Sequence, residues 1–276
     1  MSGTLYVVGT PIGNLGDITT RQLEILETVS LIAAEDTRVT RKLLSHFDIH
    51  TPLLSYHEHS PQAVIDSIIQ KLLDGDSCAV VTDAGMPCIS DPGALLVRAC
   101  IAESIPMQVV PGPSAVISAL AISGQDTGRF CFEGFLSVSK KQRFTHLEQL
   151  QNETRTMVFY EAPHKLLNTL KDMYTYFGDR SISICRELTK LHEEMRKTSL
   201  LEAISFYESQ APRGEFVLVI AGAPIVRQQE EISIDEVLET IRKRVEKGER
   251  AADVCKELAV KTGFSKRELY HAFTSQ

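Results

Sequence analysis

Apolar and polar residues alternate along the first 125 residues in a pattern that predicts strands and helices by turns. Short apolar runs typical of buried strands lie at 5–8, 31–34, 52–56, 78–81 and 108–110. Stretches with apolar residues three or four positions apart, typical of helices, lie at 20–29, 37–47, 63–73, 94–102 and 115–122. Regular alternation of this kind predicts a mostly parallel sheet with covering helices.

Beyond residue 125 the apolar runs become longer and alternate less regularly with helical patterns. Strands are predicted at 130–135, 156–160, 181–185 and 215–221, and long helices at 140–151 and 163–177. This pattern favours a second α/β domain with more antiparallel character. A polar stretch at 224–231 is predicted to be a linker.

Three short helical patterns follow, at 234–247, 250–262 and 265–274, and Gly263 and Ser265 suit a helix stop and the next N-cap. The sequence therefore predicts an α/β fold with three parts. They are an N-terminal α/β domain (1–125), a second α/β domain (126–224) with a cleft between the two, and a helix-turn-helix-like module (232–276).

Composition narrows the class of protein. Of 276 residues, 43% are hydrophobic and 24% charged, which is ordinary for a soluble globular protein. The N-terminus lacks a basic stretch, so no signal peptide is expected, and the apolar run 217–226 is too short to span a membrane. The six cysteines include no CxxC pair, so we expect reduced thiols, no metal site and a cytoplasmic location.

Charge is unevenly distributed along the chain. The net charge is −7, yet residues 241–276 carry nine basic residues against five acidic ones. A basic tail on an acidic body suggests contact with nucleic acid. A solvated helical face explains the same pattern equally well.

Residues 82–93, TDAGMPCISDPG, follow the predicted strand 78–81 and are the most informative segment of the chain. In open α/β sheets, ligands bind outside the carboxyl ends of the strands. Gly85 permits close approach of backbone to a ligand, while Asp83 and Asp91 offer carboxylates. Such an acidic turn suits a neutral or cationic ligand better than a phosphate.

Two further turns follow predicted strands in the same way. Residues 9–14, GTPIGN, match neither the GxGxxG dinucleotide motif nor a phosphate-binding loop. In residues 111–115, PGPSA, two prolines fix the backbone, and Ser114 is expected to cap the following helix. Three such turns at three strand ends together predict a small-molecule site.

Seven strings of residues carry a resemblance to a known family. They are TPIGN (10–14), AEDTR (34–38), SYHEH (55–59), the 82–93 turn, PGPSA (111–115), FYEAPH (159–164) and RELTK (186–190). Over about residues 4–222 the chain resembles the tetrapyrrole methylase superfamily, and within it the ribosomal RNA small subunit methyltransferase I branch. The C-terminal helices are also similar to an extension found in that branch.

The resemblance implies an S-adenosylmethionine-dependent methyltransferase that 2′-O-methylates the ribose of a cytidine in 16S ribosomal RNA. It also implies a homodimer, with ribosomal RNA or the 30S subunit as partner. By resemblance, the cofactor-binding residues are Pro11, Asp83, Ala84, Gly85, Ile89, Ser90, Asp91, Ser114, Ala115, Tyr160, Glu161, Ala162, Pro163, Ala221 and Gly222. By the same resemblance, residues 160–163 and the strand ending at 221–222 would approach from the second domain, near the adenine. The string 86–88, MPC, departs slightly from relatives.

Methyl transfer to a ribose hydroxyl benefits from a general base. The candidates, all polar residues at or near predicted strand ends, are Glu35, Asp36, His57, Glu58, Glu187 and Lys190. Next to Glu187, the lysine is expected to have a raised pKa, which would make it a poor base.

The candidates for RNA contact are Arg38, Arg186, Lys266 and Arg267. A structural network of ion pairs explains Glu35, Asp36, Arg38, Arg186, Glu187 and Lys190 equally well. The last helix has packing in a dimer as its alternative role. Two other functions stay open: methylation of a tetrapyrrole, and a nucleic-acid-binding regulator.

Overall fold

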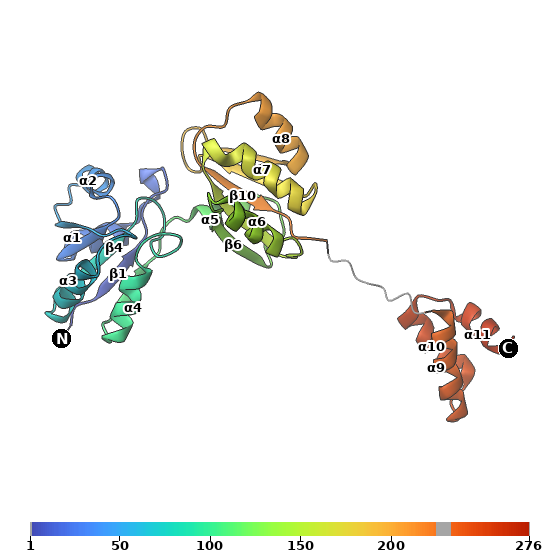
Figure 1. Ribbon diagram of the computed structural model, residues 1–276. Helices are drawn as coiled ribbons and strands as arrows, with labels where there is room; N and C mark the ends of the chain where they lie inside the picture. The colour runs from blue at the N-terminus through green and yellow to red at the C-terminus, as the bar shows by residue number, and fades with distance from the viewer. Residues whose placement is uncertain (1, 225–232, 276) are drawn as a thin grey trace. The chain divides into compact units, whose positions relative to one another are not determined.

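The computed structural model describes residues 2–224 and 233–275. By its contacts the chain divides into two compact units, 1–223 and 224–276 (Figure 1). The predicted linker lies, apart from Pro224, outside the described residues. The further boundary expected at residue 125 stays a prediction.

The first sheet is entirely parallel, with strand order β3-β2-β4-β1-β5. Its strands are β1 (Leu5–Val8), β2 (Leu31–Ala34), β3 (Leu53–Ser55), β4 (Cys78–Val81) and β5 (Met107–Val110). One face packs against α1 (Thr20–Thr28) and α2 (Thr37–His46), and the other against α3 (Gln62–Leu73) and α4 (Ala94–Ala102). A short 3₁₀ turn, η1 (Leu15–Asp17), follows β1. The predicted strands and helices of this part are confirmed to within a residue or two at each end.

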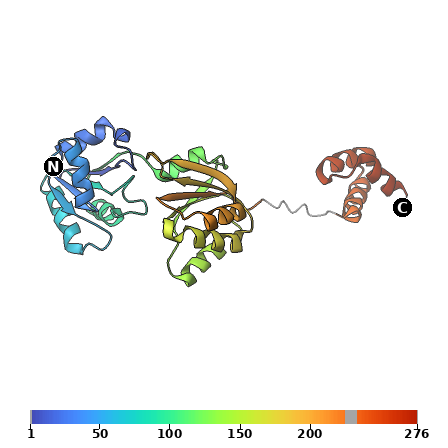
Figure 2. The same ribbon diagram turned by 90° about the horizontal axis from the view of Figure 1, so that it is seen from above.

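The second sheet has strand order β6-β7-β10-β8-β9 and is mostly antiparallel; β6 and β7 alone among its described neighbours run parallel. The strands are β6 (Phe130–Phe135), β7 (Thr156–Glu161), β8 (Ser181–Arg186), β9 (Glu194–Ser199) and β10 (Phe216–Ile220). One face carries α5 (Ala115–Ile122), and the other α6 (Lys140–Gln149), α7 (Pro163–Phe177) and α8 (Leu200–Ser209) (Figure 2). The predicted antiparallel character is confirmed.

Helix α5 precedes residue 125 yet packs on the second sheet. Its buried residues Val116, Ala119 and Leu120 share one apolar cluster with Val158 of β7 and Val217 of β10. Because α5 begins directly after the loop that follows β5, it ties that loop to the second sheet.

Two elements, β9 and α8, were not predicted from the sequence. Strand β9 is largely polar, with Glu194, Arg196 and Lys197 along it, so it has no apolar run to signal a strand. It exists because it pairs along its whole length with β8 at the edge of the sheet. Helix α8 begins with a reciprocal capping box between Ser199 and Glu202, a signal that the sequence did offer.

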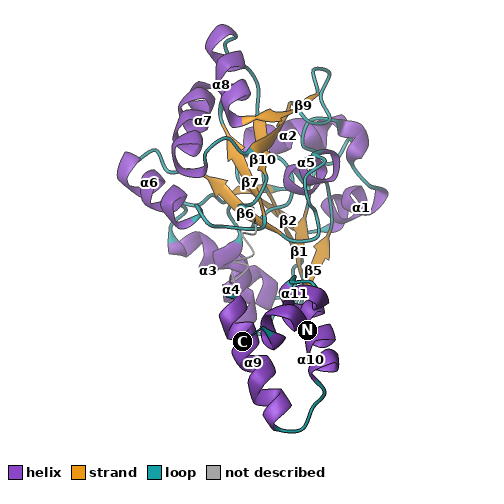
Figure 3. Cartoon of the chain, turned by 90° about the vertical axis from the view of Figure 1, so that its right-hand side faces the viewer, coloured by secondary structure: helices purple, strands orange, loops and turns teal. Residues whose placement is uncertain are grey.

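The second unit is a bundle of α9 (Ile234–Glu246), α10 (Ala251–Thr262) and α11 (Lys266–Thr274) around its own apolar cluster (Figure 3). The predicted stop and cap are confirmed: Gly263 is left-handed (φ +80°), and the Ser265 hydroxyl accepts from the Glu268 amide. The expected basic excess shrinks, however. Over residues 234–276 nine basic residues face eight acidic ones, because α9 begins with three acids.

Candidate active site

The three turns singled out in the sequence leave three neighbouring strands, β4, β1 and β5. The Thr10 amide donates to the Gly85 carbonyl at 2.9 Å, and the Gly85 amide donates back to the Thr10 carbonyl at 3.1 Å. The Gly112 amide lies 3.3 Å from the Met86 sulfur. The predicted convergence of these three loops is therefore confirmed.

Close packing between the loops depends on Gly9. A Cβ built there would lie 2.7 Å from the Gly112 Cα and 2.8 Å from the Met86 sulfur. On its other side, the fully buried Gln22 of α1 donates from its side-chain nitrogen to the Gly9 carbonyl at 2.6 Å. The backbone of Gly9 is therefore in close contact with Gly112 and Met86 and is hydrogen-bonded to Gln22, so any side chain at this position would clash.

Carboxylate side chains from the loops after β2 and β4 lie close together at the start of α2. One Glu35 oxygen accepts from the Thr82 hydroxyl at 2.5 Å, and an Asp83 oxygen accepts from the Asp36 amide at 3.1 Å. Burial raises the pKa of Asp91 to about 6; a hydrogen bond from Thr82 opposes the shift, while the charges of Glu35 and Asp83 add to it. Such a cluster of acids favours a ligand that carries positive charge.

The loop that carries Asp91 has an unusual backbone. Cys88 and Ser90 adopt left-handed conformations, with φ +71° and +59°. Non-glycine residues adopt this region at an energetic cost, and they persist there mainly in functional loops. In the same loop the apolar side chain of Ile89 is 56% exposed.

The second sheet approaches this loop through β6 and β7. Burial raises the pKa of Tyr160 to about 12, with the Asp91 charge adding to the shift, and the Tyr160 hydroxyl meets the backbone of Val116. At the bulge of β6, a Cβ on Gly134 would lie 3.2 Å from the Ser90 hydroxyl. The structure therefore brings Tyr160 together with the 82–93 loop and the start of α5.

Ser114 occupies the N-cap position of α5, but its side chain makes no capping hydrogen bond. The expectation that its hydroxyl caps the helix was therefore wrong. The backbone there is extended (φ −137°), and the hydroxyl stays available to a ligand together with the first amides of α5, which starts at Ala115.

The Glu161 carboxylate is hydrogen-bonded within the second sheet and α7. Its buried carboxylate accepts from the Thr169 hydroxyl at 2.5 Å and from the Ala162 amide at 2.7 Å. These bonds fix the start of α7, where Pro163 is the first residue.

Ala221 and Gly222 directly follow β10. Strand β10 runs antiparallel to β7, with Phe216 opposite Glu161 and Ile220 opposite Met157. Residues 221–222 therefore follow the end of β10 that is remote from Tyr160, and Gly222 packs against the backbone of Thr154. The expected roles of residues 160–163 and 221–222 near the adenine stay predictions.

Lys190 and Glu187 lie beside the loop that follows β1. The Lys190 ammonium is 3.0 Å from a Glu187 oxygen and 3.0 Å from a Glu215 oxygen, and its side chain leaves no room for a Cβ at Gly13. Burial favours a lower pKa for Lys190, but the hydrogen bonds to Glu215 and Glu187 outweigh burial and raise it. Lys190 is therefore a cation in this setting, as the sequence predicted.

Other candidate side chains are also held in ion pairs. The hydrogen bond from Arg38 lowers the pKa of Asp36 to about 2, and an Asp36 oxygen accepts from the Arg38 amide at the start of α2. Arg186 pairs with Glu194 of β9 at 3.1 Å. The ion pairs of Asp36 with Arg38 and of Glu187 with Lys190, on which the alternative of a structural network rests, are present in the structure.

His57 follows β3 and is exposed. Among the described residues its side chain makes no hydrogen bond or ion pair. The structure does not bring it into contact with the other candidate bases. Within the same described ranges, no three His, Cys, Asp or Glu side chains are placed to hold a metal ion, and no helix is long and apolar enough to cross a membrane.

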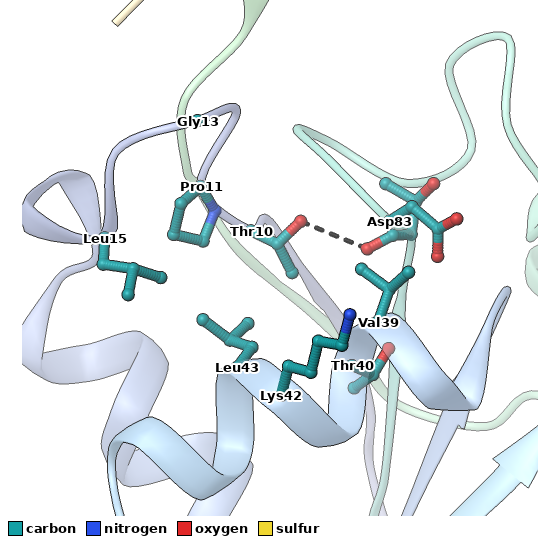
Figure 4. Close-up of a pocket in the computed structure, with 10 residues that line it drawn as sticks. Thr10, Pro11, Gly13, Leu15, Val39, Thr40, Lys42, Leu43 and Asp83 are labelled. Carbon is teal, nitrogen blue, oxygen red and sulfur yellow. Dashed lines mark hydrogen bonds between the residues drawn. The ribbon is translucent and has the colours of Figure 1, made fainter. Parts of the chain in front are cut away.

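A pocket of about 240 Å³ opens beside the acidic cluster (Figure 4). Its lining comes from the β1 loop, from η1, from α2 and from the end of β4. The lining residues are Thr10, Pro11, Gly13, Leu15, Val39, Thr40, Lys42, Leu43, Thr82 and Asp83. Figure 4 shows Val39, Lys42 and Leu43 of α2 facing Thr10 and Pro11 across this space.

The model of the family "Tetrapyrrole (Corrin/Porphyrin) Methylases" matches residues 4–204. This range contains all three converging loops and most of the second sheet. The chain belongs to the tetrapyrrole methylase family.

Curated proteins similar to this tetrapyrrole methylase include two named "Ribosomal RNA small subunit methyltransferase I". The one from Synechocystis sp. is 46% identical over 97% of this chain and 96% of its own length. The one from Thermotoga maritima is 49% identical over 80% of this chain and 99% of its own length, so about a fifth of the present chain has no counterpart in it. Among solved structures, uroporphyrin-III-C-methyltransferase from Thermus thermophilus is similar in fold, with a TM-score of 0.55 at 19% identity over 79% of this chain and 94% of its own.

The sequence analysis of this methylase missed several residues that shape the site. Gln22 locks the first loop, and its only signal is the pattern Thr19-x-x-Gln22, which forms a capping box. The α2 residues Val39, Thr40 and Leu43 line the pocket, and helical spacing alone does not distinguish them from ordinary packing residues.

Proposed function

We propose that this protein transfers a methyl group from S-adenosylmethionine to the 2′-hydroxyl of a cytidine in small-subunit ribosomal RNA. Support comes from relatives that carry the corresponding name and align over nearly the whole chain. The structural observation that carries the proposal is the convergence of the loops after β1, β4 and β5 around partly buried carboxylates. We also propose that it acts in the cytoplasm as a homodimer, as the family resemblance leads us to expect.

The residues present fit the donor. Asp91 offers a carboxylate to its cationic methionine portion, and Ile89 and Tyr160 offer apolar surface to its rings. Gly85, with φ +88°, lets backbone approach closely, and Ser114 offers a hydroxyl that makes no capping hydrogen bond. When bound, S-adenosylmethionine supplies an electrophilic methyl group, so the protein has mainly to align donor and acceptor.

The acceptor side is proposed to lie at Glu35, Asp36, His57, Glu187 and Lys190. Two of these carboxylates, Asp36 and Glu187, already accept hydrogen bonds from cations, which weakens each as a base. Glu35 is held by Thr82 close to Asp83 and differs from them in having no cationic partner among the described residues. We therefore rank Glu35 first as the general base.

RNA contact is proposed for exposed cations in both units. The Arg38 side chain is 84% exposed although paired with Asp36, so one guanidinium edge remains open to phosphate. In the second unit, Lys266 and Arg267 begin α11, are exposed and have no acidic partner within the described part of the chain. Arg186 is proposed only as a secondary contact because its guanidinium is already paired with Glu194.

A transfer assay tests the proposed function. The protein is incubated with labelled S-adenosylmethionine and, in separate reactions, small ribosomal subunits, naked ribosomal RNA and uroporphyrinogen. We expect label in the ribosomal substrate, released as a 2′-O-methylcytidine on nuclease digestion. Label in the tetrapyrrole alone overturns the proposal, and tight duplex DNA binding without any transfer favours a regulator.

Lys190→Arg is expected to retain methyl transfer to within about tenfold, whereas Lys190→Met loses more. The raised pKa of Lys190 means that its cation, not its neutral amine, holds Glu187 and Glu215 in place. An arginine keeps that charge and cannot act as a base. Single-turnover rates measure both variants. An arginine variant as inactive as the methionine variant identifies Lys190 as the base.

Removal of residues 233–276 is expected to weaken RNA capture while leaving donor affinity unchanged. The second unit has its own apolar cluster, and a relative without about a fifth of the present chain shares 49% of its residues over the remainder. Because the unit is nearly neutral overall, we expect a modest loss of RNA affinity, about tenfold, from the loss of Lys266, Arg267 and their neighbours. Filter binding and calorimetry measure the two affinities. Equal loss of both shows that the unit is structural.

A further inference from the structure

We propose that the pocket beside α2 binds the base of the nucleotide that is methylated. This inference rests on the proposed function and adds a recognition site for the acceptor. Three features carry it: the size and walls of the pocket, an unpartnered hydroxyl within it, and its position next to the donor loops.

The pocket suits a single planar ring. Its volume of about 240 Å³ lies below the roughly 300–1,000 Å³ typical of sites for drug-sized ligands, so it is small for a whole nucleotide or the methyl donor. Its apolar walls are Pro11 and Leu15 on one side and Val39 and Leu43 on the other. Leu15 and Val39 are 41% and 39% exposed, so apolar surface at the pocket is open to a ligand. Enzymes that draw a nucleotide into a cleft hold its base between apolar walls of this kind.

A buried hydroxyl in the lining has no partner. Thr40 is 3% exposed, and its side-chain oxygen makes no hydrogen bond within the described ranges. Buried polar groups are rarely left without a partner, because the loss of hydration is then uncompensated. The hydroxyl can both donate and accept, so it suits the polar edge of a base. Lys42, exposed and without an ion pair in the described structure, lies one turn from Val39 and adds a donor at the pocket.

The pocket adjoins the proposed donor site. Pro11 and Asp83 belong to both, and Thr82 lines the pocket while it bonds Glu35. A base held against α2 therefore places its own ribose near Asp83 and Glu35. The 2′-hydroxyl has to lie there to reach both the methyl group of the donor and the general base. The same placement would not result if the pocket held a distant nucleotide of the RNA.

Filling the pocket tests the proposal. Val39→Phe adds a ring at the pocket wall and is expected to lower kcat/KM for the ribosomal substrate at least about tenfold, since a misfit of even one methylene in a hydrophobic pocket costs about 10–200-fold. Affinity for S-adenosylmethionine, measured by calorimetry, is expected to stay within twofold. The matched control is Leu73→Phe, at a similarly exposed helical position (43%) on α3, outside the pocket lining.

Replacing the hydroxyl provides a second variant that preserves folding. Thr40→Val removes a buried group that has no partner, so the melting temperature is not expected to fall, while KM for RNA rises about threefold to tenfold. Thr40→Ser keeps the hydroxyl and is expected to stay near the wild-type KM. If Thr40 has a purely structural role, KM for RNA stays unchanged in both variants. Thr40→Ser is then the less stable of the two.

The outcomes separate this inference from the proposed function. If the wild-type protein methylates ribosomal RNA and Val39→Phe does so equally well, the pocket does not hold the acceptor base. If Val39→Phe loses donor affinity in parallel with activity, the pocket belongs to the donor. Absence of transfer by the wild-type protein to either ribosomal substrate overturns the proposed function itself.

Discussion

A single methyl group at position 9 is expected to abolish tight binding of the methyl donor. In Gly9→Ala the added Cβ lies 2.7 Å from the Gly112 Cα and 2.8 Å from the Gly112 nitrogen, both main-chain atoms that cannot rotate away. The loops after β1 and β5 must separate, which displaces the backbone proposed to bind the donor. A displacement of about 1 Å in such a site costs on the order of a hundredfold, and the overpacking costs about 1–3 kcal/mol of stability. Calorimetry with S-adenosylmethionine and thermal unfolding measure the two effects.

Gly16→Ala is the matched control. Gly16 lies in the same segment between β1 and α1, and a Cβ there meets only the Asn14 side chain, at 3.2 Å. We expect its donor affinity to equal that of the wild-type protein. If Gly9→Ala also binds donor normally, the close packing of the three loops does not create the donor site.

The positions of the strand ends could be predicted from the sequence, because short apolar runs followed by glycine, proline and acidic residues mark where buried strands stop. Gly85, Asp83 and Ser114 were identified on that basis, and the order β4-β1-β5 makes their loops neighbours. The sequence predicted antiparallel character for the second sheet, but it did not show which strands pair or in which register. Tyr160 and Ala221 both lie at or next to a strand end, but because β7 and β10 run antiparallel these ends are at opposite edges of the sheet.

Side-chain partners were equally hidden from a one-dimensional pattern. Arg186 was singled out as a polar residue at a strand end and Glu161 by the family resemblance, yet Arg186 is paired with Glu194 and Glu161 accepts from Thr169. Conversely, Thr40 has helical spacing typical of packing, and only the three-dimensional arrangement leaves its hydroxyl buried without a partner. Polarity at a strand end therefore located the site, while the partners decided which side chains are available in it.

Asp91→Asn is expected to weaken donor binding and, at the same time, to stabilise the ligand-free protein at neutral pH. Burial raises the pKa of Asp91 from 3.8 to about 6 in the folded protein. A raised carboxyl pKa contributes stability below pH 3.8, and that contribution is lost as the pH rises through 6. At pH 7.5 the ionised Asp91 side chain therefore destabilises the ligand-free protein, and a bound cationic ligand offsets this destabilisation. We expect a tenfold or greater loss of affinity for S-adenosylmethionine in the variant, because a charged hydrogen bond contributes about 1.5–3 kcal/mol.

The pH dependence provides the sharper measurement. For the wild-type protein, affinity for S-adenosylmethionine should fall by up to about tenfold per pH unit as the pH drops below 6, because protonation removes the charge that the donor requires. Asp91→Asn should show a flat profile and a higher melting temperature at pH 7.5. Asp66→Asn, on α3 and hydrogen-bonded to Gln62, should retain the wild-type profile. A pH dependence that survives in Asp91→Asn assigns the titration to another group and removes Asp91 from the donor site. A carboxylate that binds the ligand but destabilises the ligand-free fold predicts this combination: its removal lowers donor affinity and raises stability.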